Sequence, residues 1–246
     1  TSMLGACGSS NTSSSSASST ATSSVSASSA SEEDTTAASS SVSASSASEE
    51  VSADADQEAA DKVAALIDQI DAIYVQERND NTDEQCKEAK EAWDALTDAQ
   101  KELVEGENAD PDYFGRDTGD ASKDDPLNGD EIGENELLVV SFGTSFNDSR
   151  AEDIGGVEKA LQAAYPDWSV RRAFTAQIII NHVQARDDEK IDNVDQALER
   201  AVSNGVKNLI IQPTHLMHGA EYDELKEAVD GYKDKFESVT IAEPLL

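Results

Sequence analysis

Residues Glu136–Phe142 read ELLVVSF, and this continuous apolar run is typical of a strand that is buried on both faces of a sheet. Farther along the chain, short apolar runs alternate with helical patterns. Further strands are expected at 169–174, 208–213 and 239–242, and helices at 151–165, 176–185, 194–202 and 221–236. Short strands that alternate with helices predict an α/β domain with a parallel, doubly wound sheet.

Three predicted loops follow strands of this sheet. They are Gly143–Asp148, Thr175–Ile178 and Thr214–Tyr222. Because the carboxyl ends of parallel strands meet at one edge, and ligands of doubly wound sheets bind outside that edge, the functional site is expected at these loops.

The same loops carry a family resemblance. The segments LLVVSFGTSFNDSR (Leu137–Arg150), RAFTAQIII (Arg172–Ile180) and IQPTHLMHGAEYDEL (Ile211–Leu225) resemble, in order and spacing, the amino-terminal half of the anaerobic sirohydrochlorin cobaltochelatases. The resemblance spans 136–246, and EPLL at 243–246 resembles the place where that half leads into the second. It implies a chelatase-like half-domain of a lyase that inserts Co²⁺ into sirohydrochlorin during cobalamin synthesis. Cobalt is then a substrate, and no organic cofactor is expected.

The resemblance also implies roles for single residues. His215 and Glu221 become candidate catalytic groups, since an imidazole or a carboxylate accepts a proton near neutral pH. His215 and His218 become candidate metal ligands. The candidate groups for the carboxylates of the substrate are Ser141, Thr144, Ser145, Arg172 and Thr175.

Several of these side chains also have a purely structural interpretation. Glu221 would stabilise the positive end of a helix, Arg172 would form an ion pair at a strand end, and His218 would simply be exposed. His182 lies within a predicted helix, away from the strand ends, and is expected to be structural.

Two functions from different classes stay open. The first is the chelatase, whose second half would lie beyond Leu246 if the sequence is a fragment. The alternative is a non-catalytic surface lipoprotein that binds tetrapyrrole or metal. A homo-oligomer is possible in either case.

The amino terminus predicts a location. Leu4-Gly5-Ala6-Cys7 fits a bacterial lipobox, in which Cys7 is lipidated, and a signal peptide is expected before Thr1. The residues that follow are mostly Ser, Ala and Thr, so 1–56 is expected to be a disordered tether. These features predict an extracytoplasmic lipoprotein anchored in the membrane.

A small helical module is predicted at 57–105. Apolar residues from Val63 to Tyr74 form one helical stripe, and Cys86, Ala89, Trp93 and Leu96 form a second. Two capping boxes are expected to start helices, at Thr82–Gln85 and at Thr97–Gln100. The segment 89–104 resembles helical modules of cell-surface proteins from Gram-positive bacteria. The Asp-rich and Gly-rich segment 106–135 is expected to be a flexible linker.

The charge of the chain excludes several partners. The formal net charge is −33, which argues against nucleic acid and against a basic membrane-binding face. Two cysteines, far apart in sequence, do not make a disulfide framework. No apolar run has the length of a transmembrane helix.

Overall fold

The computed structural model describes residues 42–72, 75–107, 109, 114, 119–244 and 246. The lipobox and most of the predicted tether lie outside these residues. Residues 43–246 form one compact unit. Within the described part of the chain, no helix combines the length and the apolar character needed to cross a membrane.

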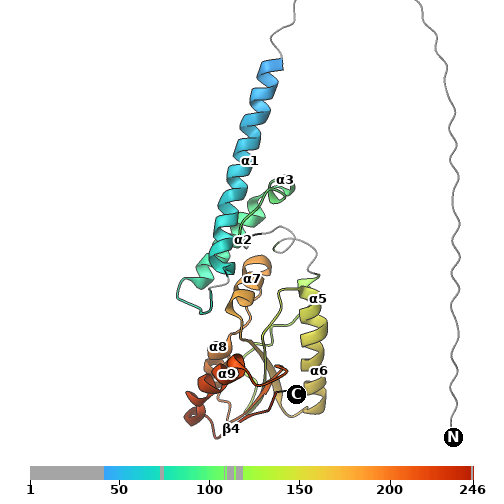
Figure 1. Cartoon of the computed structure of the whole chain (residues 1–246). Coiled ribbons are helices and arrows are strands. Elements are labelled where there is room, and N and C mark those ends of the chain that lie inside the picture. The colour runs from blue at the N-terminus through green and yellow to red at the C-terminus, as the bar shows by residue number, and fades with distance from the viewer. Residues whose placement is uncertain (1–41, 73–74, 108, 110–113, 115–118, 245) are drawn as a thin grey trace, which may run out of the picture. The chain divides into compact units, whose positions relative to one another are not determined.

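A parallel four-stranded sheet is the centre of the carboxy-terminal domain (Figure 1). Its strands are β1 (Asn135–Ser141), β2 (Ser169–Phe174), β3 (Asn208–Pro213) and β4 (Ser238–Ile241), in the order β2-β1-β3-β4. In the register of the sheet, Val140 lies beside Ala173 on β2 and beside Pro213 on β3. The prediction of a doubly wound α/β fold is confirmed, and each strand begins and ends within one residue of its predicted bounds.

Helices cover both faces of the sheet. They are α5 (Asn147–Ser149), the π-helix η2 (Arg150–Ile154), α6 (Gly155–Ala164), α7 (Gln177–Asp187), α8 (Val194–Ser203), α9 (Ala220–Asp230) and the 3₁₀ turn η3 (Lys233–Lys235). Leu138 and Val140 of β1 pack on one face with residues of α8 and α9. Leu137 and Val139 pack on the other face, where Leu161 of α6 covers them. This alternation explains the continuous apolar run of β1, because both sets of side chains are buried.

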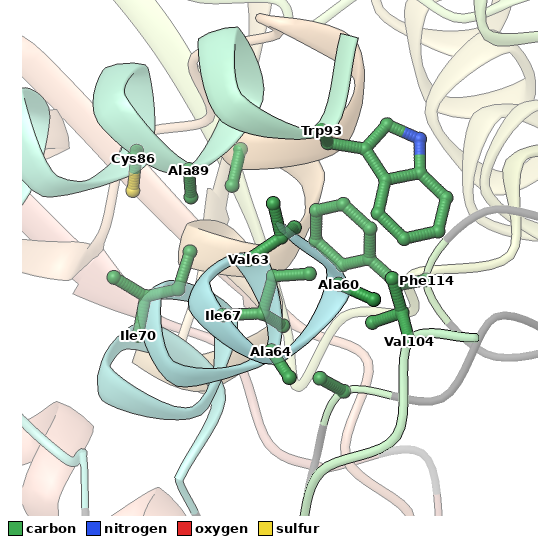
Figure 2. Close-up of a cluster of buried hydrophobic side chains, with 12 residues drawn as sticks. Ala60, Val63, Ala64, Ile67, Ile70, Cys86, Ala89, Trp93, Val104 and Phe114 are labelled. Carbon is green, nitrogen blue, oxygen red and sulfur yellow. The ribbon is translucent and has the colours of Figure 1, made fainter. Parts of the chain in front are cut away.

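The helical module consists of α1 (Val42–Asp71), α2 (Thr82–Ala95) and α3 (Asp98–Lys101). Its core, shown in Figure 2, brings together Ile67 and Ile70 of α1, Cys86 and Trp93 of α2, and Phe114. The rings of Trp93 and Phe114 meet edge to face, with centroids 5.0 Å apart. The predicted burial of Cys86 is confirmed, and burial raises the pKa of its thiol to about 12, so the group stays protonated.

The two predicted capping boxes have different outcomes. At Thr97 the box is complete, since Thr97 accepts from the Gln100 N–H and the Gln100 side chain accepts from the Thr97 N–H. At Thr82 the prediction was wrong. Thr82 is the first residue of α2, and its hydroxyl accepts a hydrogen bond from the Asn79 N–H instead. The Gln85 N–H, which the predicted box needed as a donor, donates to the Asn81 carbonyl at 2.9 Å.

The start of α1 corrects the predicted tether. Helix was expected from about residue 57, but α1 begins at Val42. Burial begins only near Ala60, and residues 52–55 are exposed. Once the packed segment 60–71 is helical, adding a preceding residue costs little free energy, because each further turn forms its own hydrogen bonds.

The helical module contacts the α/β domain through α7. The imidazole Nδ1 of His182 pairs with the carboxylate of Asp71, and both side chains are fully buried. The Asn181 side chain donates to the carbonyl of Ile70 at 3.2 Å, and the Cys86 thiol lies 3.6 Å from the carbonyl of Asn181. The module and the domain therefore pack together, whereas the sequence predicted a separable unit. The predicted structural role of His182 agrees with its position.

The predicted linker at 106–135 also contributes to the core. Phe114 is fully buried against the ring of His182, with centroids 5.0 Å apart. Asp120 caps the 3₁₀ turn η1 (Ala121–Lys123) by accepting from the Ser122 N–H. The Asp124 side chain is 1% exposed and pairs with two arginines. These described residues do not form a flexible linker, because their partners lie in distant parts of the sequence.

Glu136 makes folding stability dependent on pH. Glu136 is 2% exposed, and burial raises the pKa of its carboxyl to about 7. The folded chain therefore holds a proton that the unfolded chain releases near its ordinary pKa of 4.5. A raised folded-state pKa gives stability that is complete below pH 4.5 and is lost as pH rises through 7. We expect a loss of about 2–3 kcal/mol between pH 5 and pH 8.

Urea unfolding at both pH values measures this effect. Glu136→Gln should remove that part of the pH dependence. The exposed neighbour Glu134, changed to Gln, should leave it in place. Equal pH dependence in the Glu136→Gln variant and the parent chain would contradict the assignment.

Candidate functional site

The carboxyl ends of β1 and β3 form the switch point of the sheet. The chain leaves β1 toward β2 on one side, whereas β3 leads to β4 on the other side. The two loops after these strands therefore diverge and leave space at the edge between them. A hydrogen bond of 2.9 Å from the Thr214 hydroxyl to Ser141 Oγ joins the two strand ends at this point.

The turn after β1 has a fixed shape. Gly143 has a φ of 103°, and a Cβ atom there would lie 2.5 Å from the ring of Phe174. The Thr144 hydroxyl accepts from the Phe146 N–H at 3.2 Å, and the buried Ser145 accepts through its carbonyl from Arg186 at 2.7 Å. Hydrogen bonds to the Thr144 hydroxyl and from Arg186 of α7 thus fix the conformation of the turn. Of its predicted substrate-binding residues, Thr144 is half-buried and Ser145 is buried.

His215 and Glu221 lie together at the carboxyl end of β3. His215 Nε2 is 3.2 Å from Glu221 Oε2, with the imidazole side chain 10% exposed and the carboxylate 45% exposed. Neither ring nitrogen of His215 has a hydrogen-bond partner among the described residues. A nearly buried imidazole that offers the lone pair of one ring nitrogen, beside a carboxylate, is suited to hold a divalent cation or to accept a proton.

His218 lies apart from this pair. Its Nε2 is 2.9 Å from Glu243 Oε2, its side chain is 60% exposed, and its ring meets the ring of Tyr222 edge to face. The two predicted metal ligands, His215 and His218, thus each have their own carboxylate partner. Across the described ranges, no three His, Cys, Asp or Glu side chains form a group that could hold a metal ion. The metal role of His218 stays a prediction.

The position of Arg172 differs from its predicted role in binding the substrate. Its side chain is 1% exposed, and it donates to Glu158 at 2.7 Å and to Asp124 at 2.6 Å. Although burial by itself lowers the pKa of the guanidinium, these hydrogen bonds raise it above its ordinary value. Both carboxylate partners of the guanidinium are buried inside the protein. The ion-pair interpretation of Arg172 is therefore the correct one.

The network around Arg172 contains residues that the sequence did not single out. Arg150 is fully buried and donates to Asp124 at 2.7 Å and to Glu189 at 3.0 Å. Burial raises the pKa of the Glu189 carboxyl to about 7. Burial by itself would raise the pKa of the Asp124 carboxyl, but hydrogen bonds from Arg172 hold this pKa below its ordinary value. Asp124 lies in an Asp-rich stretch, and nothing in its local pattern marks it as buried.

A groove of roughly 720 Å³ opens beside Thr175, at the carboxyl end of β2. Thr175 Oγ1 is buried and has no hydrogen-bond partner among the described residues. The groove is lined by the first turns of α8 and α9, including Glu221, and by the segment 76–80 of the helical module. Two of the predicted site residues, Thr175 and Glu221, therefore line the same groove.

Apolar side chains are exposed on the loops that follow β1 and β3. They are Phe142, Phe146, Leu216 and Met217, each 49–67% exposed. The amide of Leu246 donates to the carbonyl of Leu216 at 2.9 Å, which places another exposed apolar residue beside these loops. Exposed apolar side chains near polar groups are typical of a binding surface.

Comparisons with known proteins agree with this arrangement. Residues 135–246 match the family described as cobalt chelatase (CbiK). The chain is 38% identical over 110 residues to the sirohydrochlorin cobaltochelatase of Salmonella typhimurium, covering 45% of this chain and 42% of that protein. It is 28% identical over 112 residues to the sirohydrochlorin cobaltochelatase CbiKC of Nitratidesulfovibrio vulgaris, covering 45% and 39%. The chain thus spans about two fifths of the length of these relatives.

Proposed function

We propose that residues 135–246, which belong to the cobalt chelatase family, form one wall of a site that inserts Co²⁺ into sirohydrochlorin. The observation that supports this most is the His215–Glu221 pair, in which Nε2 of His215 lies 3.2 Å from Glu221 Oε2 and Nδ1 has no hydrogen-bond partner among the described residues. The pair lies at the switch point of a doubly wound sheet, where such folds bind ligands. The exposed apolar side chains beside it provide a surface for a flat macrocycle.

The reaction exchanges one metal cation for two pyrrole protons, so charge balances without any redox step. The imidazole of His215 holds the cation by a lone pair or accepts a pyrrole proton. Glu221 stabilises either positive charge and, being 45% exposed, passes a proton on to solvent. Thr144, Ser145 and the amides of their turn offer hydrogen bonds to the carboxylates of the substrate.

Catalysis by such a site depends on enclosing the macrocycle. Chelation requires a tetrapyrrole held on both faces, and such positioning accounts for several kcal/mol of a barrier. Because the chain spans about two fifths of its relatives, the second wall is proposed to come from a further half. The 246-residue chain by itself is therefore expected to be a poor catalyst.

His215→Ala and Glu221→Gln are expected to lower the rate of cobalt insertion at least tenfold in the full natural gene product, because each removes a ligand or a proton acceptor. The measurement is the absorbance change of sirohydrochlorin with Co²⁺ under anaerobic conditions. Glu227→Gln, an exposed position on the same helix as Glu221 that does not line the groove, is the matched control and should leave the rate unchanged.

Unchanged rates in both variants would contradict the proposed roles. A full-length product that binds cobalt or sirohydrochlorin but inserts none would favour the alternative, a non-catalytic binding lipoprotein. Full activity of the 246-residue chain would contradict the need for a second wall.

We also propose that Cys7 anchors the protein to the outer side of a membrane as a lipoprotein. The support is the sequence Leu4–Cys7 and the Ser-rich stretch behind it. When the gene is expressed with its native upstream region, the parent protein should take up a labelled fatty acid and partition into membranes, and Cys7→Ala should do neither. Equal labelling of both proteins would contradict the anchor.

A further inference from the structure

The groove beside Thr175 has a wall that does not belong to the chelatase domain. Residues 76–80 come from the helical module, outside the matched range 135–246. This wall is held in place from both sides. The Asp71–His182 pair precedes it, and Arg78 binds Asp83 at 2.6 Å while Asp83 also accepts from Gln184 of α7 at 2.7 Å. The groove is therefore a joint feature of the module and the domain.

Carboxylates dominate the lining of this groove. One guanidinium, Arg78, is present and is already paired with Asp83. The lining carboxylates, which together define the acidic groove, are Glu77, Asp80, Asp195, Glu199, Glu221 and Glu224. Within the described part of the chain, none of them has an ion pair with a lysine or arginine. Their charges therefore add to a negative potential that is not neutralised locally.

Stabilisation of helix termini explains only part of this cluster. Asp195 and Glu221 lie in the first turns of α8 and α9, where acidic side chains stabilise the positive end of a helix. Glu199 and Glu224 lie beyond those turns, and Glu77 belongs to no helix. Asp80 lies in the turn before α2 and likewise belongs to no helix, so four carboxylates need another explanation.

The second observation is an imidazole in contact with one of these carboxylates. Glu221 lines the groove and is 3.2 Å from His215 Nε2. The His215 side chain is nine-tenths buried, and neither of its nitrogens has a hydrogen-bond partner among the described residues. The carboxylate in contact with this imidazole is thus also a lining residue of the groove.

We propose that the acidic groove is the approach path for the substrate metal, which attracts divalent cations and delivers them to the His215–Glu221 pair. This inference rests on the proposed function. The carboxylates act through their summed field, since no three of the described side chains form a coordination site. Such focusing raises association rates by about 10–10³-fold. The same field repels the carboxylates of the tetrapyrrole, so metal and macrocycle approach the pair by different routes.

The test measures Co²⁺ binding to the full natural gene product by stopped-flow absorbance, with cobalt chloride as the only ligand. A groove variant combines Glu77→Gln, Asp80→Asn, Glu199→Gln and Glu224→Gln. A control variant makes the same change of charge at exposed acidic residues that do not line the groove: Glu152→Gln, Asp167→Asn, Asp234→Asn and Glu237→Gln. The groove variant should associate about tenfold more slowly at low ionic strength, with little change in dissociation rate.

At about 1 M salt, where the Debye length falls to roughly 3 Å, the groove variant and the parent chain should converge. An unchanged association rate, or an equal loss in the control variant, would overturn the approach path and leave the proposed function intact. Unaltered Co²⁺ affinity in His215→Ala, or no Co²⁺ binding at all, would contradict the proposed function and with it the destination of the path.

Discussion

Arg172→Ala is expected to lower the free energy of unfolding by about 3–5 kcal/mol. The substitution leaves the carboxylates of Glu158 and Asp124 buried, at 2% and 1% exposure, without the guanidinium that both of them contact. Removing one partner of a buried ion pair has a cost of this size, because Glu158 then has neither water nor a counter-ion, although Asp124 keeps its pair with Arg150. Urea unfolding at pH 7 measures the change.

Arg171, the neighbouring residue of β2, is the matched control. It is half-buried, and its guanidinium donates to the carbonyl of Val170 at 3.1 Å. Arg171→Ala should cost at most about 1 kcal/mol. Adding Glu158→Gln to Arg172→Ala should recover part of the loss, since one buried charge disappears. A stable Arg172→Ala protein with weakened sirohydrochlorin binding would instead restore the substrate-binding role.

Asp71→Ala is expected to cost about 3 kcal/mol and to loosen α7 from the helical module. The carboxylate and its partner His182 are both fully buried, and burial raises the pKa of Asp71 above its ordinary value. Its loss removes the polar contact that joins the end of α1 to α7 inside an apolar cluster. Amide exchange in α7 should increase, and chemical unfolding should shift for the module and the domain together.

Asp61 on the same helix provides the comparison. It is exposed and accepts a hydrogen bond from Gln57 four residues earlier. Asp61→Ala should change stability by less than about 0.5 kcal/mol, as is usual for an exposed site. Two separate unfolding transitions in the parent chain, with only the first affected by Asp71→Ala, would show that the module folds independently.

The coupling of module and domain matters for the site. Residues 76–80 follow directly on the Asp71–His182 contact, and they line the groove that Glu221 also lines. A loosened module would therefore change the groove without touching His215. Asp71→Ala should accordingly slow Co²⁺ association under conditions in which the protein remains folded.

Local sequence patterns determined the architecture of the carboxy-terminal domain. The apolar run at 136–142 predicted a strand buried on both faces, and the segments 169–174 and 208–213 were predicted with the bounds that β2 and β3 have. Each such pattern depends on neighbours within a few residues, so the sequence displays it directly. The position of His215 and Glu221 after β3 also followed, because a parallel sheet brings its strand ends to one edge.

The tertiary structure alone decided which side chains find partners. Arg172 looked available for substrate, but Asp124, 48 positions earlier in the chain, occupies it. Asp71 pairs with His182 across 111 positions, which turned an apparently separate helical module into part of one compact unit. Hydrophobic periodicity gives no information about such pairings, since a buried carboxylate and a solvated one can stand in the same local sequence. Only the folded chain shows which charges are removed from water together.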